Sequence, residues 1–93
     1  MSPEERLDSV VDRESFLAFV RALIEEREEA ERMERDEPER YRWGGALNWQ
    51  NSEISAFLEA ALNDFEPGPF HQPEWPPSWK MFAEFLYFGK IYE

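Results

Sequence analysis

The segment 78–88 constrains the fold of this chain most, because an unusually wide face of it is apolar. On a helical wheel its apolar side chains cover about 220°, which leaves only Lys80, Glu84 and Tyr87 on the wet side. The apolar side chains are Trp79, Met81, Phe82, Ala83, Phe85, Leu86 and Phe88. A helix of this kind must be covered on two sides, so the sequence predicts a helix at the centre of a bundle.

Two arrangements would cover such a helix. In the first, two other helices pack against different faces of it, and we favour this one because small domains often enclose their carboxy-terminal helix. In the second, Met81, Phe85 and Phe88 stay exposed and form a surface for a partner or for a second copy of the chain. The chain is therefore expected to be a monomer or a homodimer.

Two further helices are expected, at about 12–35 and about 52–65. Asp12 can cap the first, and Asn51 or Ser52 can cap the second, because a side-chain oxygen at that position accepts a hydrogen bond from a free backbone amide. In both segments the apolar residues recur at helical spacing and give the helix one face to bury. These residues are Phe16, Leu17, Phe19, Val20, Leu23 and Ile24 in the first segment and Ile54, Phe57, Leu58, Ala61, Leu62 and Phe65 in the second.

The third helix is expected at about 78–88, with Ser78 as its cap and Gly89 as a left-handed stop. Proline-rich residues 66–78 precede it, and an aromatic, glycine-containing segment at 41–50 precedes the second helix. Both segments are typical of ordered loops, and the second has room for one minor extended segment. The sequence therefore predicts a mainly all-α fold, a small three-helix bundle with long ordered loops.

The acidic stretch after Ile24 has two interpretations. From Glu25 to Glu39 the chain holds nine acidic residues and three arginines, and the apolar stripe has stopped. In the first interpretation the helix projects past the core as a solvated arm. In the second it attracts a basic protein, such as a nuclease toxin, or imitates the phosphates of DNA, although the interleaved arginines weaken that mimicry. The candidate partner-binding residues are Glu28, Glu29, Glu31, Glu34, Trp43, Met81, Phe85 and Phe88.

Length and charge bound the function. Ninety-three residues support one hydrophobic core, so a single domain over residues 1–93 is expected. The 21 acidic and 10 basic residues give a net charge of −11, which repels phosphate groups and anionic lipids, so neither ordinary nucleic-acid binding nor membrane binding is expected. No secretory signal is visible at Met1–Arg6 and no apolar run approaches the roughly 20 residues that span a bilayer, which favours a cytoplasmic protein.

No set of side chains marks a catalytic or metal site. His71 is the only histidine, and there is no cysteine. Asp64 lies at the edge of an apolar stripe, where a structural hydrogen bond is its expected role. Neither a Ser-His-acid set nor a phosphate-binding glycine loop is present. The chain is therefore not expected to be an enzyme, and no cofactor is expected; a small enzyme built around Asp64 and His71 is the distant alternative.

Several motifs of this chain together carry a resemblance. They are Val11-Asp12 with Phe16, Phe19 and Val20, then Trp49 with Asn51, Phe57-Leu58-Glu59-Ala60, Trp79-Lys80 with Phe82 and Ala83, and Gly89-Lys90-Ile91-Tyr92-Glu93. With these motifs the chain resembles a family of small bacterial proteins of unknown function. The likeness covers most of the chain except the acidic stretch and the Trp43-Gly44-Gly45 loop. It implies no catalytic residue and no cofactor.

Size and charge also suggest a comparison with immunity proteins, which neutralise a toxin by covering its site. The expected function is therefore a protein-binding module of immunity or adaptor type, which presents acidic and aromatic surface to a protein partner, a basic one being favoured by the charge. A homo-oligomeric structural module that uses the third helix as its interface is the alternative.

Overall fold

The computed structural model describes residues 2–65 and 76–92, apart from the side chain of Asp64. Within these ranges the chain forms four α-helices, one short 3-10 helix and no strand. The elements are α1 (Pro3–Leu7), α2 (Arg13–Asp36), η1 (Ala46–Asn48), α3 (Ile54–Phe65) and α4 (Trp79–Ile91). The predicted mainly α-helical bundle is confirmed, with one short α-helix more than expected.

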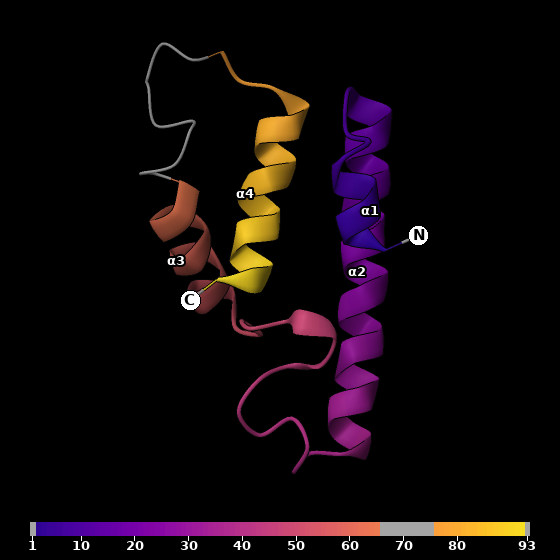
Figure 1. Cartoon of the computed structure of the whole chain (residues 1–93), viewed down its shortest axis with the longest axis vertical. Helices are drawn as coiled ribbons and strands as arrows, with labels where there is room; N and C mark the ends of the chain where they lie inside the picture. The colour runs from indigo at the N-terminus through magenta and orange to yellow at the C-terminus, as the bar shows by residue number, and fades with distance from the viewer. Residues whose placement is uncertain (1, 66–75, 93) are drawn as a thin grey trace.

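The helix α4 occupies the middle of the bundle. Figure 1 shows α3 along one side of α4, and α1 with α2 along the other side. Met81 and Ala83 of α4 are buried, and Ala60 and Ala61 of α3 have no exposed surface. The small side chains of Ala60, Ala61 and Ala83 let the two helices approach closely. The central position expected for the segment with the wide apolar face is confirmed.

The start of α2 is capped as predicted. The amide of Ser15 donates to Oδ1 of Asp12 at 2.9 Å, and the amide of Asp12 donates to Oγ of Ser15 at 3.0 Å. This reciprocal pair satisfies amides that the start of a helix leaves free. The helix ends at Asp36, because Pro38 follows closely and cannot continue it. The predicted boundaries therefore agree with α2.

The short helix α1 is an addition to the predicted helices. Ser2 caps it, since the amide of Glu5 donates to Oγ of Ser2 at 3.3 Å. Pro3 lies in its first turn, where the missing backbone donor is not needed. Pro3 is buried, and Leu7 packs against the core. Because five residues are too few to show a helical period, the pattern of apolar residues does not predict this turn.

The helix α4 runs through Gly89, which corrects the expected stop at that residue. It continues to Ile91, and the amide of Tyr92 donates to the carbonyl of Phe88 at 3.0 Å. A Cβ atom on Gly89 would lie 2.7 Å from a ring carbon of Phe57 on α3. The glycine therefore lets the Phe57 ring lie against the backbone of α4, and it does not end the helix.

The second half of α2 is not a solvated arm, which corrects the first interpretation of the acidic stretch. Ala30 has no exposed surface, and η1 and Trp49 pack against this half of the helix; Figure 1 shows η1 beside it. Met33 and Tyr41 are partly buried against the same core. The segment 41–49 has no regular period, so the sequence pattern does not reveal that it covers α2.

The exposed side of α4 also differs from the predicted one. Tyr87 packs against the core, whereas Trp79 and Phe82 remain 38% and 45% exposed. The rings of these two residues meet edge-on with centroids 5.9 Å apart, and the ring of Phe16 lies 5.3 Å from that of Trp79. Trp79 therefore holds the start of α4 against α2 without being fully buried.

Candidate functional site

Lys90 lies at the centre of a polar interior. Its side chain has no exposed surface, and its ammonium lies 2.6 Å from Oε1 of Glu26 and also pairs with Glu4. A buried ammonium is strongly disfavoured unless carboxylates compensate its charge. We call Glu4, Glu26 and Lys90 the ion cluster; they come from α1, α2 and α4, so the cluster joins three helices.

The ion cluster shifts the pKa of Glu4 and of its neighbour Tyr87. Burial opposes ionisation of Glu4, but hydrogen bonds and the positive charge of Lys90 outweigh burial, so the pKa of Glu4 lies below its ordinary value of 4.5. Burial, and then the negative charge of Glu4, raise the pKa of Tyr87 from its ordinary value of 10.0. Glu4 therefore stays charged and Tyr87 stays neutral at neutral pH.

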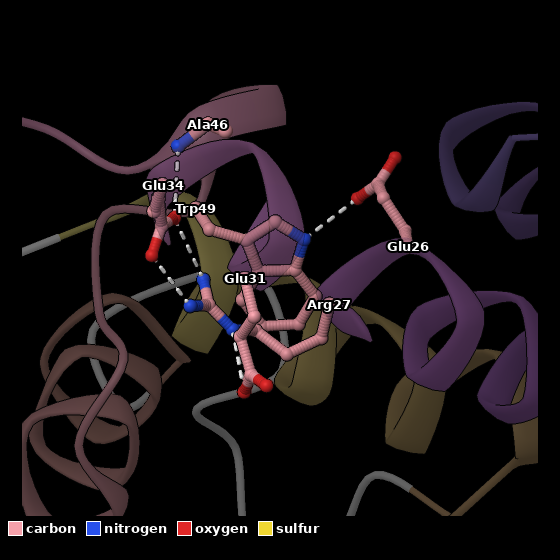
Figure 2. A network of polar contacts seen from close by, with 6 residues as sticks. All are labelled: Glu26, Arg27, Glu31, Glu34, Ala46 and Trp49. Atoms are coloured by element: carbon pink, nitrogen blue, oxygen red, sulfur yellow. Dashed lines mark hydrogen bonds and ion pairs between the residues drawn. The ribbon is translucent and has the colours of Figure 1, made fainter. Parts of the chain in front are cut away.

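The buried Trp49 connects the ion cluster to α3. Its indole Nε1 donates to Oε1 of Glu26 at 2.9 Å, as Figure 2 shows. Its ring stacks on that of Phe57, with centroids 6.3 Å apart and planes 22° apart. The guanidinium of Arg27 and the ammonium of Lys90 lie 5.5 and 5.7 Å from the indole centroid, within the range of cation–π attraction. Trp49 is therefore fixed by contacts to α2, α3 and α4.

Arg27 is held by two carboxylates of its own helix. Nη2 of Arg27 lies 2.8 Å from Oε1 of Glu34, and Nε lies 3.5 Å from Oε1 of Glu31; Figure 2 shows the guanidinium between these two acids. Oε2 of Glu34 also accepts the amide of Ala46 at 3.0 Å. Glu34 therefore attaches the 41–49 segment to α2, a structural task that the sequence pattern does not indicate.

The residues before α3 satisfy the end of α4. The amide of Gln50 donates to the carbonyl of Lys90 at 2.9 Å. Nδ2 of Asn51 donates to the carbonyl of Gly89 at 2.9 Å and also to the carbonyl of Tyr92. Carbonyls at the end of a helix have no partner within the helix, so these bonds replace water. The Gln50-Asn51 segment and the end of α4, which lie far apart in the sequence, thus contact each other.

An apolar groove lies between α2 and α3. It has a volume of about 320 Å³ and is lined by Val20, Leu23, Ile24, Arg27, Glu28, Trp49, Phe57 and Leu86. A second hollow of about 180 Å³ shares Arg27, Trp49 and Phe57 with it and extends along the start of α3 to Ile54 and Leu58. We call the two hollows together the α2–α3 groove.

The helix α3 presents an apolar ridge whose first two residues, Ile54 and Leu58, line this groove. Ile54, Leu58 and Leu62 lie on successive turns and are 81%, 46% and 53% exposed. Ile24 on the opposite wall is also exposed. Single exposed apolar side chains are common on protein surfaces, but a group of them around one groove is typical of a binding surface.

The α2–α3 groove carries negative charge. Glu28 and Glu53 are among its lining residues. Arg27 also lines it, but this cation is already paired with Glu31 and Glu34. Because Glu31 and Glu34 compensate the charge of Arg27, the two glutamates of the lining leave the groove negative, and it attracts cations.

The predicted acidic site residues differ in their surroundings. Glu28 lines the α2–α3 groove and is exposed. Glu29 is exposed and pairs with Arg32 on the same helix. Glu31 and Glu34 are engaged in the contacts to Arg27 described above, and Glu34 is partly buried. Of these four acids, Glu28 is therefore the one that lines the groove directly.

Trp43 lines a separate, polar hollow of about 400 Å³. Its side chain is 90% exposed, and the guanidinium of Arg42 lies 5.3 Å from its ring centroid. This hollow meets the α2–α3 groove at Trp49 and Ser52. The structure thus places Trp43 near the groove but outside its lining.

The three predicted interface residues of α4 do not form a free surface. Met81 is only 8% exposed, which corrects the arrangement in which it stays open to a partner. The ring of Phe85 packs edge-on against that of Phe65 at 5.5 Å, and the ring of Phe88 lies 5.6 Å from that of Tyr92. Phe85 and Phe88 are partly buried. The reason is the central position of α4, whose faces are occupied by its neighbours.

Residues 2–65 and 76–92 contain neither a candidate metal site nor a candidate membrane span. In these ranges no three or more His, Cys, Asp or Glu side chains gather where they could hold a metal ion. Likewise, none of the described helices is long and apolar enough to cross a membrane. His71 and the side chain of Asp64 lie outside the described part of the chain.

Most residues of the α2–α3 groove are absent from the predicted site. Val20, Leu23 and Phe57 lie on predicted apolar stripes, and a stripe indicates burial without telling how much of it a neighbour covers. The signal that could have revealed the groove is the broad apolar face of α3, which α4 alone cannot cover.

Comparisons with models of protein families, with curated proteins and with solved structures find no match to this chain. The resemblance to a bacterial family therefore stays a prediction.

Proposed function

We propose that the chain is a cytoplasmic protein-binding module that takes a basic protein partner at the α2–α3 groove. The observation that carries the proposal is the presence of apolar walls and acidic side chains in one groove. Apolar side chains of the partner would fill the groove, and its lysines or arginines would meet Glu28 and Glu53. A role of immunity or adaptor type belongs to this class of function.

The fixed position of Trp49 supports the proposal. Its indole is held by Glu26, Phe57 and two cations, so this part of the groove is formed before a partner arrives. Binding to a preformed surface loses less conformational entropy than binding that must first order it.

The charge of the whole chain supports a basic partner as well. A net charge of −11 attracts positively charged proteins over distances of about one Debye length, roughly 10 Å at 0.1 M salt. Such attraction raises the rate of encounter and weakens as salt is added. A salt-sensitive complex is therefore the expected behaviour.

Affinity capture tests this function. The tagged chain is incubated with lysate of its source organism at about 0.1 M and about 0.5 M salt, and bound proteins are quantified by mass spectrometry. Glu28→Gln removes an acid of the groove, and Glu39→Gln removes an exposed acid outside its lining as a matched control. We expect a basic protein that is lost at high salt and is weakened by Glu28→Gln alone. Acidic partners, or equal effects of the two variants, would contradict the proposal.

Self-association is a second candidate, and the ridge of Ile54, Leu58 and Leu62 is the observation that favours it. Two ridges could bury each other across a two-fold axis. The charge of −11 on each copy opposes this arrangement. Light scattering at high protein concentration decides between the two, since a pure monomer would exclude self-association.

A further inference from the structure

We infer that the α2–α3 groove binds one amphipathic α-helix of the partner. The apolar stripe of that helix fills the groove, and its basic residues contact the glutamates of the groove. The inference rests on the proposed function and deepens it, because it names the form and the chemistry of the segment that binds.

The walls of the groove are the helices α2 and α3, which pack on opposite sides of α4. Figure 1 shows α2 and α3 separated by α4. Val20 and Ile24 come from α2, Phe57 and Leu58 come from α3, and Leu86 comes from α4 between them. A helix laid into this groove would therefore contact all three helices and would form a second layer over α4.

The spacing of the exposed residues favours a helix as the occupant. Ile54, Leu58 and Leu62 follow one another at intervals of four residues, which forms a ridge that fits the surface groove of another helix. An extended segment would bring backbone N–H and C=O groups into an apolar groove. The described elements include no strand whose edge could satisfy these groups. A helix satisfies them internally, so it fits the groove without this loss.

Charge decides which kind of helix fits. Glu28 and Glu53 line the groove, and the charge of Arg27 is already compensated by two acids. A second copy of this chain would bring a further charge of −11 to the same place. A helix with lysine or arginine beside its apolar stripe would instead find opposite charges, which gives both attraction and specificity.

The walls set the length of the occupant. From Val20 to Glu28 the wall of α2 extends about 12 Å at about 1.5 Å per residue, and α3 contains 12 residues. A partner helix of about three turns would therefore cover the groove and reach its glutamates.

Three synthetic peptides of about 16 residues serve as probes. The first has leucines at helical spacing on one face and lysines beside them; the second has the same residues in an order that destroys the stripe; the third keeps the stripe and replaces lysine by glutamate. Binding to the full chain is measured by fluorescence anisotropy, and helix formation by circular dichroism. The variant Ile54→Gln/Leu58→Gln changes the groove. Val11→Gln is the control, since Val11 is 80% exposed and lies outside the groove lining.

We expect the striped basic peptide to bind as a helix and to lose at least about tenfold in affinity on the Ile54→Gln/Leu58→Gln chain. Val11→Gln should leave its affinity unchanged. Because Ile54 and Leu58 are exposed, the double variant should fold, and its thermal unfolding checks this. The same peptide should shift the amide resonances of groove residues such as Ile24 and Phe57.

The other outcomes separate this inference from the proposed function. Equal binding of the striped and the scrambled basic peptide, or no effect of the double variant, would overturn the binding of a helix in the groove. Neither result would contradict a basic partner. Equal binding of the striped peptides with lysine and with glutamate would support the binding of a helix in the groove and contradict the basic partner. Failure of the striped basic peptide to bind at all would overturn the inference.

Discussion

The ammonium of Lys90 lies 2.6 Å from the same carboxylate oxygen of Glu26 that accepts the indole N–H of Trp49. One partly buried acid thus fixes the end of α4 and the residue that precedes the link to α3. Because Trp49 lines the α2–α3 groove, the ion cluster also determines the shape of the candidate site. The charges inside this chain therefore support the surface on which its function is proposed to rest.

Replacing Lys90 by Met should lower the free energy of unfolding by about 2 kcal/mol, because the partly buried Glu4 and Glu26 would lose the cation that compensates their charge. Urea unfolding followed by circular dichroism measures the change. Lys80→Met is the matched control at the other end of α4, where we expect a loss below about 1 kcal/mol. Equal losses would show that the ion cluster has no special role.

Trp49→Phe should destabilise the chain by about 2 kcal/mol, because Glu26 loses a hydrogen bond and the smaller ring leaves a gap beside Phe57. Trp43→Phe is the control, since Trp43 is almost fully exposed and its replacement should change stability by less than about 0.5 kcal/mol. Thermal unfolding of both variants checks the difference. A Trp43 variant that is the less stable of the two would contradict this account of the 41–49 segment.

Gly89→Ala should destabilise the chain by about 2 kcal/mol, although alanine is the better helix former by about 1 kcal/mol. The new methyl group would lie 2.7 Å from the Phe57 ring, so the packing of α3 on α4 must change. Gly44→Ala is the control, because its methyl group would meet only Oε1 of Gln50 at 3.8 Å. Adding Phe57→Leu to Gly89→Ala should recover part of the loss. A stabilised Gly89→Ala chain would mean that α3 and α4 pack less closely.

Acid should weaken the chain through Glu4. Its pKa in the folded state lies below the ordinary value of 4.5, so its ionised form contributes stability above that value. This contribution is lost as the pH falls from 4.5 through the lower, folded-state pKa. Urea unfolding between about pH 6 and about pH 3 should therefore show a shallower loss for Glu4→Gln than for the wild type. Glu14→Gln, an exposed acid of α2, should keep the wild-type slope; identical slopes in all three chains would contradict the pairing of Glu4 with Lys90.

The three longer helices α2, α3 and α4 could be predicted because their signals are local. Asp12 and Ser78 cap helices as expected, and the apolar stripes identify α2, α3 and α4. A local signal misleads where a contact with a distant residue determines the role of an amino acid. Gly89 has the sequence features of a helix stop, yet α4 continues through it, and its missing side chain leaves room for the ring of Phe57.

The candidate site was harder to predict because no local pattern marks which apolar residues stay uncovered. Ile54 lies on the same predicted stripe as Phe57, but the neighbours of α3 leave it exposed. Lys90 and Glu26 carry ordinary charges in the sequence, and their pairing follows only from the way α4 meets α2. Glu34 is one acid among many in the acidic stretch, and its contact with Ala46 depends on the fold of the 41–49 segment.

Binding of a basic partner at the α2–α3 groove is tested most directly by quantitative capture of partners from lysate by three chains: the wild type, Ile54→Gln/Leu58→Gln and Val11→Gln. The two variants alter exposed apolar residues inside and outside the α2–α3 groove, respectively. We expect one basic protein on the wild type and on Val11→Gln, reduced by at least about tenfold on the double variant. Equal recovery of that protein by all three chains would contradict binding at the groove.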